Sequence, residues 1–363
     1  MSKHLFEPAQ LGPLTLTNRI VMAPMTRCRA LGNEPNELMA EYYRQRATAG
    51  LIVAEGTSPD ANGLGYARIP GLFTEQHVAN WQRVTETVHH HGGHIFLQLM
   101  HSGRIFHPLN LPAGAEGVGP SAVAAAGQMW TDQQQMQDQP APRALTTAEV
   151  AETVKAYAHS AKLAMDAGFD GVEVHAANGY LLEQFLRNSV NDRHDAYGGS
   201  VHNRTRLLRE VMQAVVTQIG AGRTGVRLSP ASAGTASPAD SDLQAVYTAA
   251  AAALAPLKLA FMHVVEGITG GTRDTAPFDY AAMRAAFGGP WMVNNGYTRA
   301  MALDAVASDR ADLVAFGRPF ISNPDLVQRL RDDAPWADSH RATYYGGGAE
   351  GYTDYPALHA ASA

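Results

Sequence analysis

The sequence predicts a single α/β domain, residues 1–363, folded as a (β/α)8 TIM barrel. Short apolar or β-branched runs recur along the chain, and each is followed by a polar or glycine-containing turn and then by a helical pattern. This alternation is typical of a parallel sheet connected by helices. Eight runs fit, the number of strands in such a barrel, and they span residues 19–23, 51–55, 94–99, 171–175, 225–228, 259–265, 291–293 and 313–316.

Helix signals lie between these strands. Thr146 opens a capping-box pattern, with a glutamate three residues later, and apolar residues then recur at helical spacing until Gly168. Near the end of the chain, Asn323 stands before Pro324 as a capping residue before a proline at the first helical position. This pattern predicts a last helix that runs to about Arg331 and completes the barrel.

Two segments are expected to be loops. Residues 100–145, between the third strand and the Thr146 helix, are rich in Gly, Pro, Ala and Gln. A connection of this length is usually functional or contains small elements of its own, so we expect an excursion over the barrel mouth. Residues 230–242 are rich in Ala and Ser, a composition that predicts a mobile loop.

Composition limits the partners and the compartment. A net charge of −6 and a pI near 6.2 provide no basic surface for nucleic acid or for an anionic membrane, which leaves small molecules as partners. The single cysteine, Cys28, excludes intrachain disulfides, four-cysteine zinc sites and iron–sulfur clusters, and it fits a reducing compartment. Because the N-terminal residues lack an apolar signal core, we expect a cytoplasmic protein.

Candidate functional residues follow the predicted strands, because a TIM barrel carries its active site at the C-terminal strand ends. Loops after the seventh and eighth strands usually bind phosphate. Arg227, inside an apolar strand, would be costly to bury without an anion, which a bound anionic cofactor would supply. The residues at the strand ends are Pro24, Met25, Thr26, Gly56, Gln98, His175, Asn178, Tyr180, Arg227, Asn295, Gly296, Gly317 and Arg318.

The run from His175 to Tyr180 is the most specific of these groups. His175 and Asn178 are donors three residues apart, and the phenol of Tyr180 follows across a glycine. Such a set can hold a carbonyl oxygen and deliver a proton. The alternative is a turn through Asn-Gly whose imidazole and phenol are satisfied within the core.

The combined pattern resembles the old yellow enzyme family of FMN-dependent ene-reductases. Each matching segment is short, but they occur in the family's order and cover almost the whole chain. They are Ala23-Pro24-Met25-Thr26-Arg27, Gln98-Leu99-Met100-His101-Ser102-Gly103-Arg104, His175-Ala176-Ala177-Asn178-Gly179-Tyr180, Tyr197-Gly198-Gly199-Ser200, Val226-Arg227-Leu228-Ser229-Pro230, Phe316-Gly317-Arg318-Pro319 and Gly351-Tyr352-Thr353-Asp354-Tyr355-Pro356.

The resemblance implies a set of FMN ligands. Thr26 would hydrogen-bond the flavin C4 carbonyl, while Gln98 and Arg227 would hold the pyrimidine edge and adjust the cofactor's electronics. Backbone contacts to the isoalloxazine would come from Pro24, Met25 and Gly56. The phosphate would lie against Asn295, Gly296, Gly317 and Arg318.

It also implies a substrate site. His175 and Asn178 would bind the carbonyl or nitro oxygen, and Tyr180, with a phenol pKa near ~10, would donate the proton. Hydride transfer from flavin N5 to the β-carbon builds enolate charge on that oxygen, which two donors stabilise. Three further positions match residues of the family's substrate pocket: Tyr66, Tyr352 and Met100, the last in place of the bulky aromatic of many relatives.

The resulting hypothesis is an NAD(P)H-dependent FMN oxidoreductase that reduces C=C bonds activated by carbonyl or nitro groups, as a monomer or homodimer. Two alternatives stay open: a flavin-binding protein without catalysis, and a relative of dienoyl-CoA reductase that lacks its iron–sulfur cluster. A metal-dependent barrel hydrolase would need paired ligands at strand ends, and the sequence offers none there.

Overall fold

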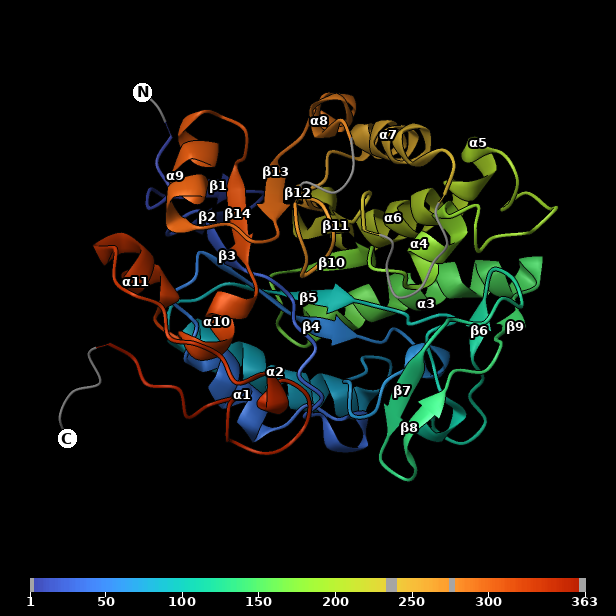
Figure 1. The fold of residues 1–363 in the computed structure, drawn as a ribbon, viewed down its shortest axis with the longest axis horizontal. Helices are drawn as coiled ribbons and strands as arrows, with labels where there is room; N and C mark the ends of the chain where they lie inside the picture. Colours follow the sequence, from blue (N-terminus) through green and yellow to red (C-terminus); the bar gives the residue numbers. More distant parts are fainter. Residues whose placement is uncertain (1–2, 233–239, 274–277, 359–363) are drawn as a thin grey trace.

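The computed structural model describes residues 3–232, 240–273 and 278–358. Eight parallel strands close a barrel (Figure 1). They are β3 (Ile20–Met22), β4 (Leu51–Thr57), β5 (Ile95–Leu99), β10 (Gly171–Ala176), β11 (Thr224–Leu228), β12 (Phe261–Val265), β13 (Trp291–Asn294) and β14 (Leu313–Phe316). Every predicted strand is confirmed, with ends that differ from the expected ones by two residues at most.

The N-terminal half of the barrel interior is an apolar core. Its side chains come from several strands and include Val53, Phe96 and Phe261, all fully buried. A hairpin of β1 (Ala9–Leu11) and β2 (Leu14–Leu16) packs against the same cluster and closes this end. The cavity-lining polar residues, such as Gln98 and Arg227, lie toward the other end of the barrel, where the strands finish.

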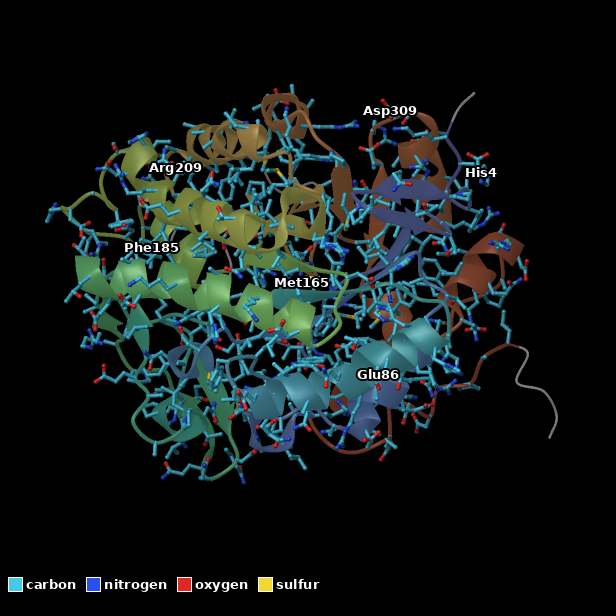
Figure 2. All side chains as sticks on the ribbon, turned by 180° about the vertical axis from the view of Figure 1, so that it is seen from behind. His4, Glu86, Met165, Phe185, Arg209 and Asp309 are labelled. Atoms are coloured by element: carbon cyan, nitrogen blue, oxygen red, sulfur yellow. The ribbon has the colours of Figure 1, made fainter. Side chains whose placement is uncertain are left out.

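Helices cover the outside of the barrel, and Figure 2 shows α2, α3 and α6 on one face. The capping box at Thr146 is confirmed: its hydroxyl accepts from the Glu149 N–H, and the Glu149 carboxylate accepts from the Thr146 N–H. None of the described helices is both long and apolar enough to cross a membrane. The helices are α1 (Glu37–Arg44), α2 (Glu75–His90), α3 (Thr147–Asp166), α4 (Leu181–Leu186), α5 (Val201–Arg204), α6 (Arg206–Ile219), α7 (Leu243–Leu254), α8 (Tyr280–Phe287), α9 (Arg299–Ala307), α10 (Arg318–Ser322) and α11 (Leu326–Asp332).

The segment between β5 and α3 contains small elements of its own. A parallel pair joins β6 (Val118–Gly119) to β9 (Arg143–Ala144), and an antiparallel hairpin joins β7 (Gln128–Thr131) to β8 (Gln135–Asp138). In Figure 1 this hairpin projects beside the barrel. The other predicted loop, residues 230–242, falls largely on residues 233–239, which lie outside the described residues.

The prediction that Asn323 caps the last helix is wrong. Asn323 follows α10, and its buried amide makes tertiary hydrogen bonds instead: it donates to the Pro319 carbonyl (2.8 Å) and accepts from the Ala337 N–H (2.8 Å). Because these contacts occupy the side chain, α11 begins three residues later without a side-chain cap.

Candidate active site

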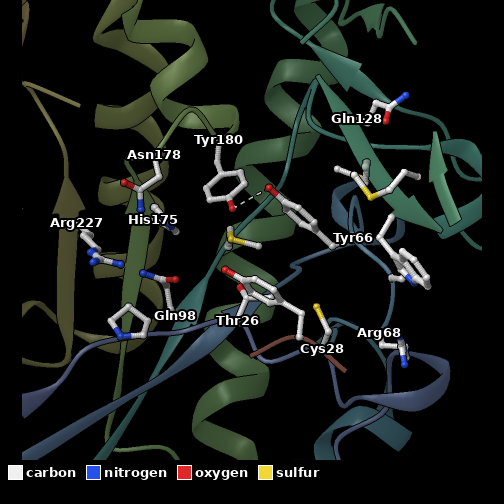
Figure 3. Close-up of a pocket in the computed structure, with 17 residues that line it drawn as sticks. Thr26, Cys28, Tyr66, Arg68, Gln98, Gln128, His175, Asn178, Tyr180 and Arg227 are labelled. Atoms are coloured by element: carbon white, nitrogen blue, oxygen red, sulfur yellow. Dashed lines mark hydrogen bonds between the residues drawn. The ribbon is translucent and has the colours of Figure 1, made fainter. Parts of the chain in front are cut away.

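Two adjoining cavities open at the C-terminal ends of the barrel strands. One has a volume of about 570 Å³ and the other about 420 Å³. Five residues line both: Pro24, Thr26, Asn178, Arg227 and Tyr345. The two cavities therefore form one site with two halves, and Figure 3 shows the larger half.

The smaller cavity contains the residues predicted to bind phosphate. Asn295, Gly296, Gly317 and Arg318 all line it, together with Met25 and the turn at residues 269–271. Asn295 holds that turn by donating to the Ile268 carbonyl (2.9 Å), and Arg318 donates to the Gly270 carbonyl (2.7 Å). A guanidinium beside glycine-rich backbone suits a phosphate dianion. The turn was missed from the sequence because a Thr-Gly-Gly run has no signal beyond that of an ordinary turn.

Arg227 lies between the two cavities and is buried. One of its terminal nitrogens donates to the Asn294 Oδ1 atom (2.9 Å), while its buried Nε atom finds no partner among the described residues. An unsatisfied buried cationic donor is costly, so this position calls for a ligand with an acceptor atom. The carbonyl-bearing, anionic FMN meets that need, with Gln98 and Thr26 lining the same cavity.

Gly56 does not line either cavity, so its predicted contact with the isoalloxazine is not supported. It is a buried residue of β4, and a Cβ atom there would lie 2.5 Å from the Met100 sulfur. The glycine makes room for Met100, which does line the larger cavity as predicted.

His175 is a neutral donor in this site. Its Nδ1 atom accepts the Ala177 N–H (3.2 Å), which assigns the ring proton to Nε2. Burial, with positive charge at Arg227 and the nearby imidazole of His263, holds the His175 pKa well below its usual value. The side chain therefore offers an uncharged N–H at neutral pH.

Asn178 is oriented by its neighbours. The Thr269 hydroxyl donates to the Asn178 Oδ1 atom (2.6 Å), so the amide NH2 is the group left to donate into the cavity. Its backbone is left-handed (φ 57°), and its N–H donates to the Ser229 hydroxyl (2.8 Å). The next N–H, of Gly179, is bound by the Glu183 carboxylate.

Tyr180 is a protonated phenol beside these donors. Its hydroxyl donates to that of Tyr66 (3.2 Å, dashed in Figure 3), and its ring meets the His175 ring edge to face at 5.0 Å. Burial raises the pKa of Tyr180 to about 12, despite the opposing effect of the Tyr66 bond. The predicted set of His175, Asn178, Tyr180 and Tyr66 thus lines one cavity.

Tyr352, predicted to shape the substrate pocket, lines neither cavity. Tyr352 is fully buried outside both cavities, stacked on Tyr42 with 4.0 Å between ring centroids. The exposed Tyr345 lines both cavities instead. Arg27 anchors that segment by donating to the Tyr344 carbonyl (3.0 Å). The three glycines after Tyr345 were the one feature of the sequence that could have indicated a loop at the mouth of the barrel.

The outer end of the larger cavity comes from the β7–β8 hairpin and the loop after β4. Sequence reasoning missed these residues, whose Gln-rich surroundings show no site pattern. Arg68 forms an ion pair with Asp132 (3.0 Å), which also accepts from the Trp130 indole N–H (3.0 Å). In Figure 3, Arg68 and Gln128 lie at the opposite end from His175. Further lining comes from Cys28, Ala67, Met129, Trp130 and Met136.

Comparison with known proteins gives consistent matches. Residues 4–336 match the family described as NADH:flavin oxidoreductase / NADH oxidase. The chain is 41% identical over 372 residues to 12-oxophytodienoate reductase 7 of Oryza sativa subsp. japonica, covering 98% of this chain and 94% of that protein. It is 40% identical to a probable flavin mononucleotide-dependent alkene reductase of Leishmania infantum, covering 97% of each.

Solved structures agree with these matches. The old yellow enzyme homologue from Zymomonas mobilis superimposes with a TM-score of 0.93 at 42% identity, covering 98% of this chain and 100% of that one. Morphinone reductase in complex with tetrahydroNAD superimposes with a TM-score of 0.92 at 41% identity, covering 98% of each chain.

Proposed function

This chain belongs to the old yellow enzyme family, described as NADH:flavin oxidoreductase / NADH oxidase, and from that premise we propose which of its residues perform the reaction. It is an FMN-dependent ene-reductase that uses a reduced nicotinamide cofactor to reduce activated C=C bonds. The observation that carries the assignment of roles is the meeting of two neutral donors and a protonated phenol in one cavity beside Arg227. A non-catalytic flavin-binding role would need none of these groups.

Bound FMN would supply the hydride carrier between NAD(P)H and the β-carbon of the alkene. Within the proposal, Asn295, Gly296, Gly317 and Arg318 hold its phosphate, because they line the smaller cavity together. Pro24, Met25 and Thr26 flank its ring, while Gln98 and Arg227 hold the polar edge. The unpartnered Arg227 Nε supports this arrangement.

The proposed clamp on the substrate oxygen consists of the His175 Nε2–H and the Asn178 NH2 group. Negative charge builds on that oxygen as the β-carbon receives its hydride. Donors already oriented by the protein stabilise that charge without further reorganisation. The Ala177 N–H orients His175, and the Thr269 hydroxyl orients Asn178.

Tyr180 is the proposed proton donor to the α-carbon. Because its pKa is about 12, the phenol keeps its proton until negative charge develops on the substrate. Tyr66 holds the Tyr180 hydroxyl in place through their 3.2 Å hydrogen bond. Tyr345, at the opening of the cavity, completes the aromatic wall.

The proposed substrates are small activated alkenes or nitro compounds with an apolar body, because Met100, Met129, Trp130 and Met136 line the rest of the cavity. We place the enzyme in the cytoplasm, consistent with one cysteine that is not paired. NADH and NADPH are both proposed as reductants, and the enzyme is proposed to act as a monomer or homodimer. Size-exclusion chromatography with light scattering distinguishes these two states.

The direct test uses the purified protein. It is expected to be yellow, to release FMN on denaturation, to bleach with NAD(P)H under nitrogen and to regain its colour with cyclohexenone. A colourless protein that takes up no added FMN would contradict the proposed function.

Tyr180→Phe tests the proton donor. The variant is expected to be reduced by NAD(P)H at nearly the normal rate, while reoxidation by cyclohexenone slows by about 10²-fold or more, the usual contribution of a positioned acid. Stopped-flow absorbance of the flavin measures the two steps separately. Tyr345→Phe is the matched control, and it should change neither step by a comparable factor. Equal slowing of both steps by Tyr180→Phe would remove Tyr180 from this role.

A further inference from the structure

A polar cluster occupies the barrel interior beneath the active site, where TIM barrels usually carry bulky apolar side chains. Gln98 in β5, Glu173 in β10, Arg227 in β11 and His263 in β12 are each at most 5% exposed. The strand register places Gln98 opposite Glu173, and Arg227 opposite His263. Two proposed FMN ligands, Gln98 and Arg227, are thus paired with Glu173 and His263, which have no role in the function described so far.

Glu173 is connected to both of the neighbouring side chains. One carboxylate oxygen accepts from the Gln98 amide (2.8 Å), and the other contacts the His263 Nδ1 atom (2.7 Å). His263 keeps a lowered pKa because of burial and the nearby Arg227, although Glu173 opposes this shift. The imidazole is therefore neutral and donates from Nδ1, with Nε2 as a buried acceptor that finds no partner among the described residues. Both carboxylate oxygens of Glu173 are thus engaged, one by the Gln98 amide and the other by the His263 ring.

The positive charge nearby is Arg227. Its guanidinium bonds to the Asn294 amide rather than to Glu173. The negative charge of Glu173 nevertheless acts on the Arg227 guanidinium through the buried interior, where it raises the Arg227 pKa against the lowering caused by burial, and the Arg227 Nε–H is left without a partner among the described residues.

We propose that Glu173, held by His263, is a positioning residue that lowers the reduction potential of the bound FMN by offsetting the charge of Arg227 and by orienting Gln98. The proposal rests on the proposed function, because it requires Gln98 and Arg227 to face the cofactor. It assigns a role to a buried carboxylate that lines neither cavity.

The sign follows from electrostatics. Reduction makes the cofactor more electron-rich, so a nearby cation favours the reduced form and a nearby anion disfavours it. With Glu173 in place, the effect of Arg227 is diminished. The lower potential makes hydride donation to the alkene more favourable, and hydride uptake from NAD(P)H less so.

Glu173→Gln removes the charge while keeping an oxygen that accepts from Gln98. We expect the midpoint potential of the bound FMN, measured by anaerobic titration against a reference dye, to rise by about 30 mV or more. This corresponds to a tenfold change in the reduction equilibrium of a two-electron couple. Flavin reduction by NADPH should accelerate and reoxidation by cyclohexenone should slow, whereas a merely structural defect would slow both steps.

Glu55→Gln is the matched control, because Glu55 is also a buried carboxyl of a barrel strand. The Glu55 carboxyl accepts from the Tyr43 hydroxyl (3.2 Å), and the cations that act on it are Arg27 and Arg29 rather than Arg227, so this substitution should shift the potential far less than Glu173→Gln does. If Glu173→Gln does not fold, Glu173→Met, of similar length and without charge, should show the same rise.

An unchanged or lower potential in these Glu173 variants, or slowing of both half-reactions together, would overturn the proposal. Failure of the proposed function is separate and is seen in the wild type, which would then bind no FMN or reduce no enone.

Discussion

At the scale of single residues, the charge state of His175 decides how the site treats its substrate. An imidazolium would bind the oxygen tightly in the ground state as well as in the transition state, and uniform binding of that kind does not raise kcat. Burial beside Arg227 keeps the ring neutral. The clamp therefore responds mainly to charge that develops during the reaction.

The His175 pKa gives a testable pH dependence. Because this pKa lies well below the usual ~6.5, the ring does not titrate between pH 6 and 8, and KM for cyclohexenone should be flat over that range. Steady-state kinetics with cyclohexenone, an uncharged substrate, measures KM at each pH. A KM that changes several-fold with a midpoint near pH 6.5, and loses this dependence in His175→Asn, would contradict the neutral assignment.

At the scale of elements, the turn between β10 and α4 presents the substrate ligands. Asn178 and Gly179 are both left-handed (φ 57° and 82°), a geometry that costs energy at a non-glycine residue. Their N–H groups converge on the Ser229 hydroxyl and the Glu183 carboxylate, and the Ser229 hydroxyl itself donates to Glu183 (2.9 Å). The buried Glu183 side chain thus fixes the left-handed conformation of this turn, which presents Asn178 to the cavity.

Ser229→Ala tests this support. The substitution leaves the Asn178 N–H without its partner, which costs about 1–3 kcal/mol of stability and loosens the turn. KM for cyclohexenone should rise several-fold. Tyr247→Phe is the matched control, because the Tyr247 hydroxyl donates to the same Glu183 Oε1 atom as Ser229 but makes no hydrogen bond to the Asn178 or Gly179 N–H. It should lower Tm without raising KM, and an equal rise in KM in both variants would contradict the assignment.

The elements also show what the sequence could predict. All the barrel strands were found because buried parallel strands have short apolar runs with turns on both sides. Asn323 was misassigned because its amide bonds to Ala337, a tertiary contact that no local pattern reveals. The same limit applies to two tyrosines. Tyr345 precedes a glycine and Tyr352 follows one, so the sequence around them is similar. Only the packing of Tyr352 on Tyr42 shows that Tyr345 is the one that lines the cavity.

The cavity itself was predicted in part. Residues at strand ends, such as Thr26 and Arg227, were found because barrel topology brings strand ends to one mouth. The contribution of the β7–β8 hairpin was not predicted. Its Trp130 and Met136 belong to a long connection, and the order of the strands does not show where such a connection runs.

At the scale of the whole molecule, buried neutral histidines make stability depend on pH. Burial lowers the pKa of His101, His175 and His263, so these groups stay uncharged in the folded chain. In the unfolded chain they bind protons as pH falls through ~6.5. Their contribution to stability is therefore fully present above that pH and is lost below it.

The titration of Glu55 changes the pH dependence of stability in the opposite direction. Its pKa is raised to about 7 by burial, so between pH ~4.5 and 7 the folded chain holds a proton that the unfolded chain has released. This term favours folding as pH falls. Because three histidines act against this one carboxyl, we expect unfolding to take up protons overall below pH ~6.5, so that stability falls as the pH is lowered.

Denaturant unfolding of the holoenzyme at pH 7.5, 6.5 and 5.5 measures this loss. The free energy of unfolding should fall between the last two values. His263→Gln should reduce the slope by about one proton, because it removes one titrating group from the unfolded chain while the amide can still donate to Glu173. A free energy that is constant or rises on acidification would show that the buried histidines are charged in the folded state, and the neutral His175 on which the proposed clamp depends would fall with it.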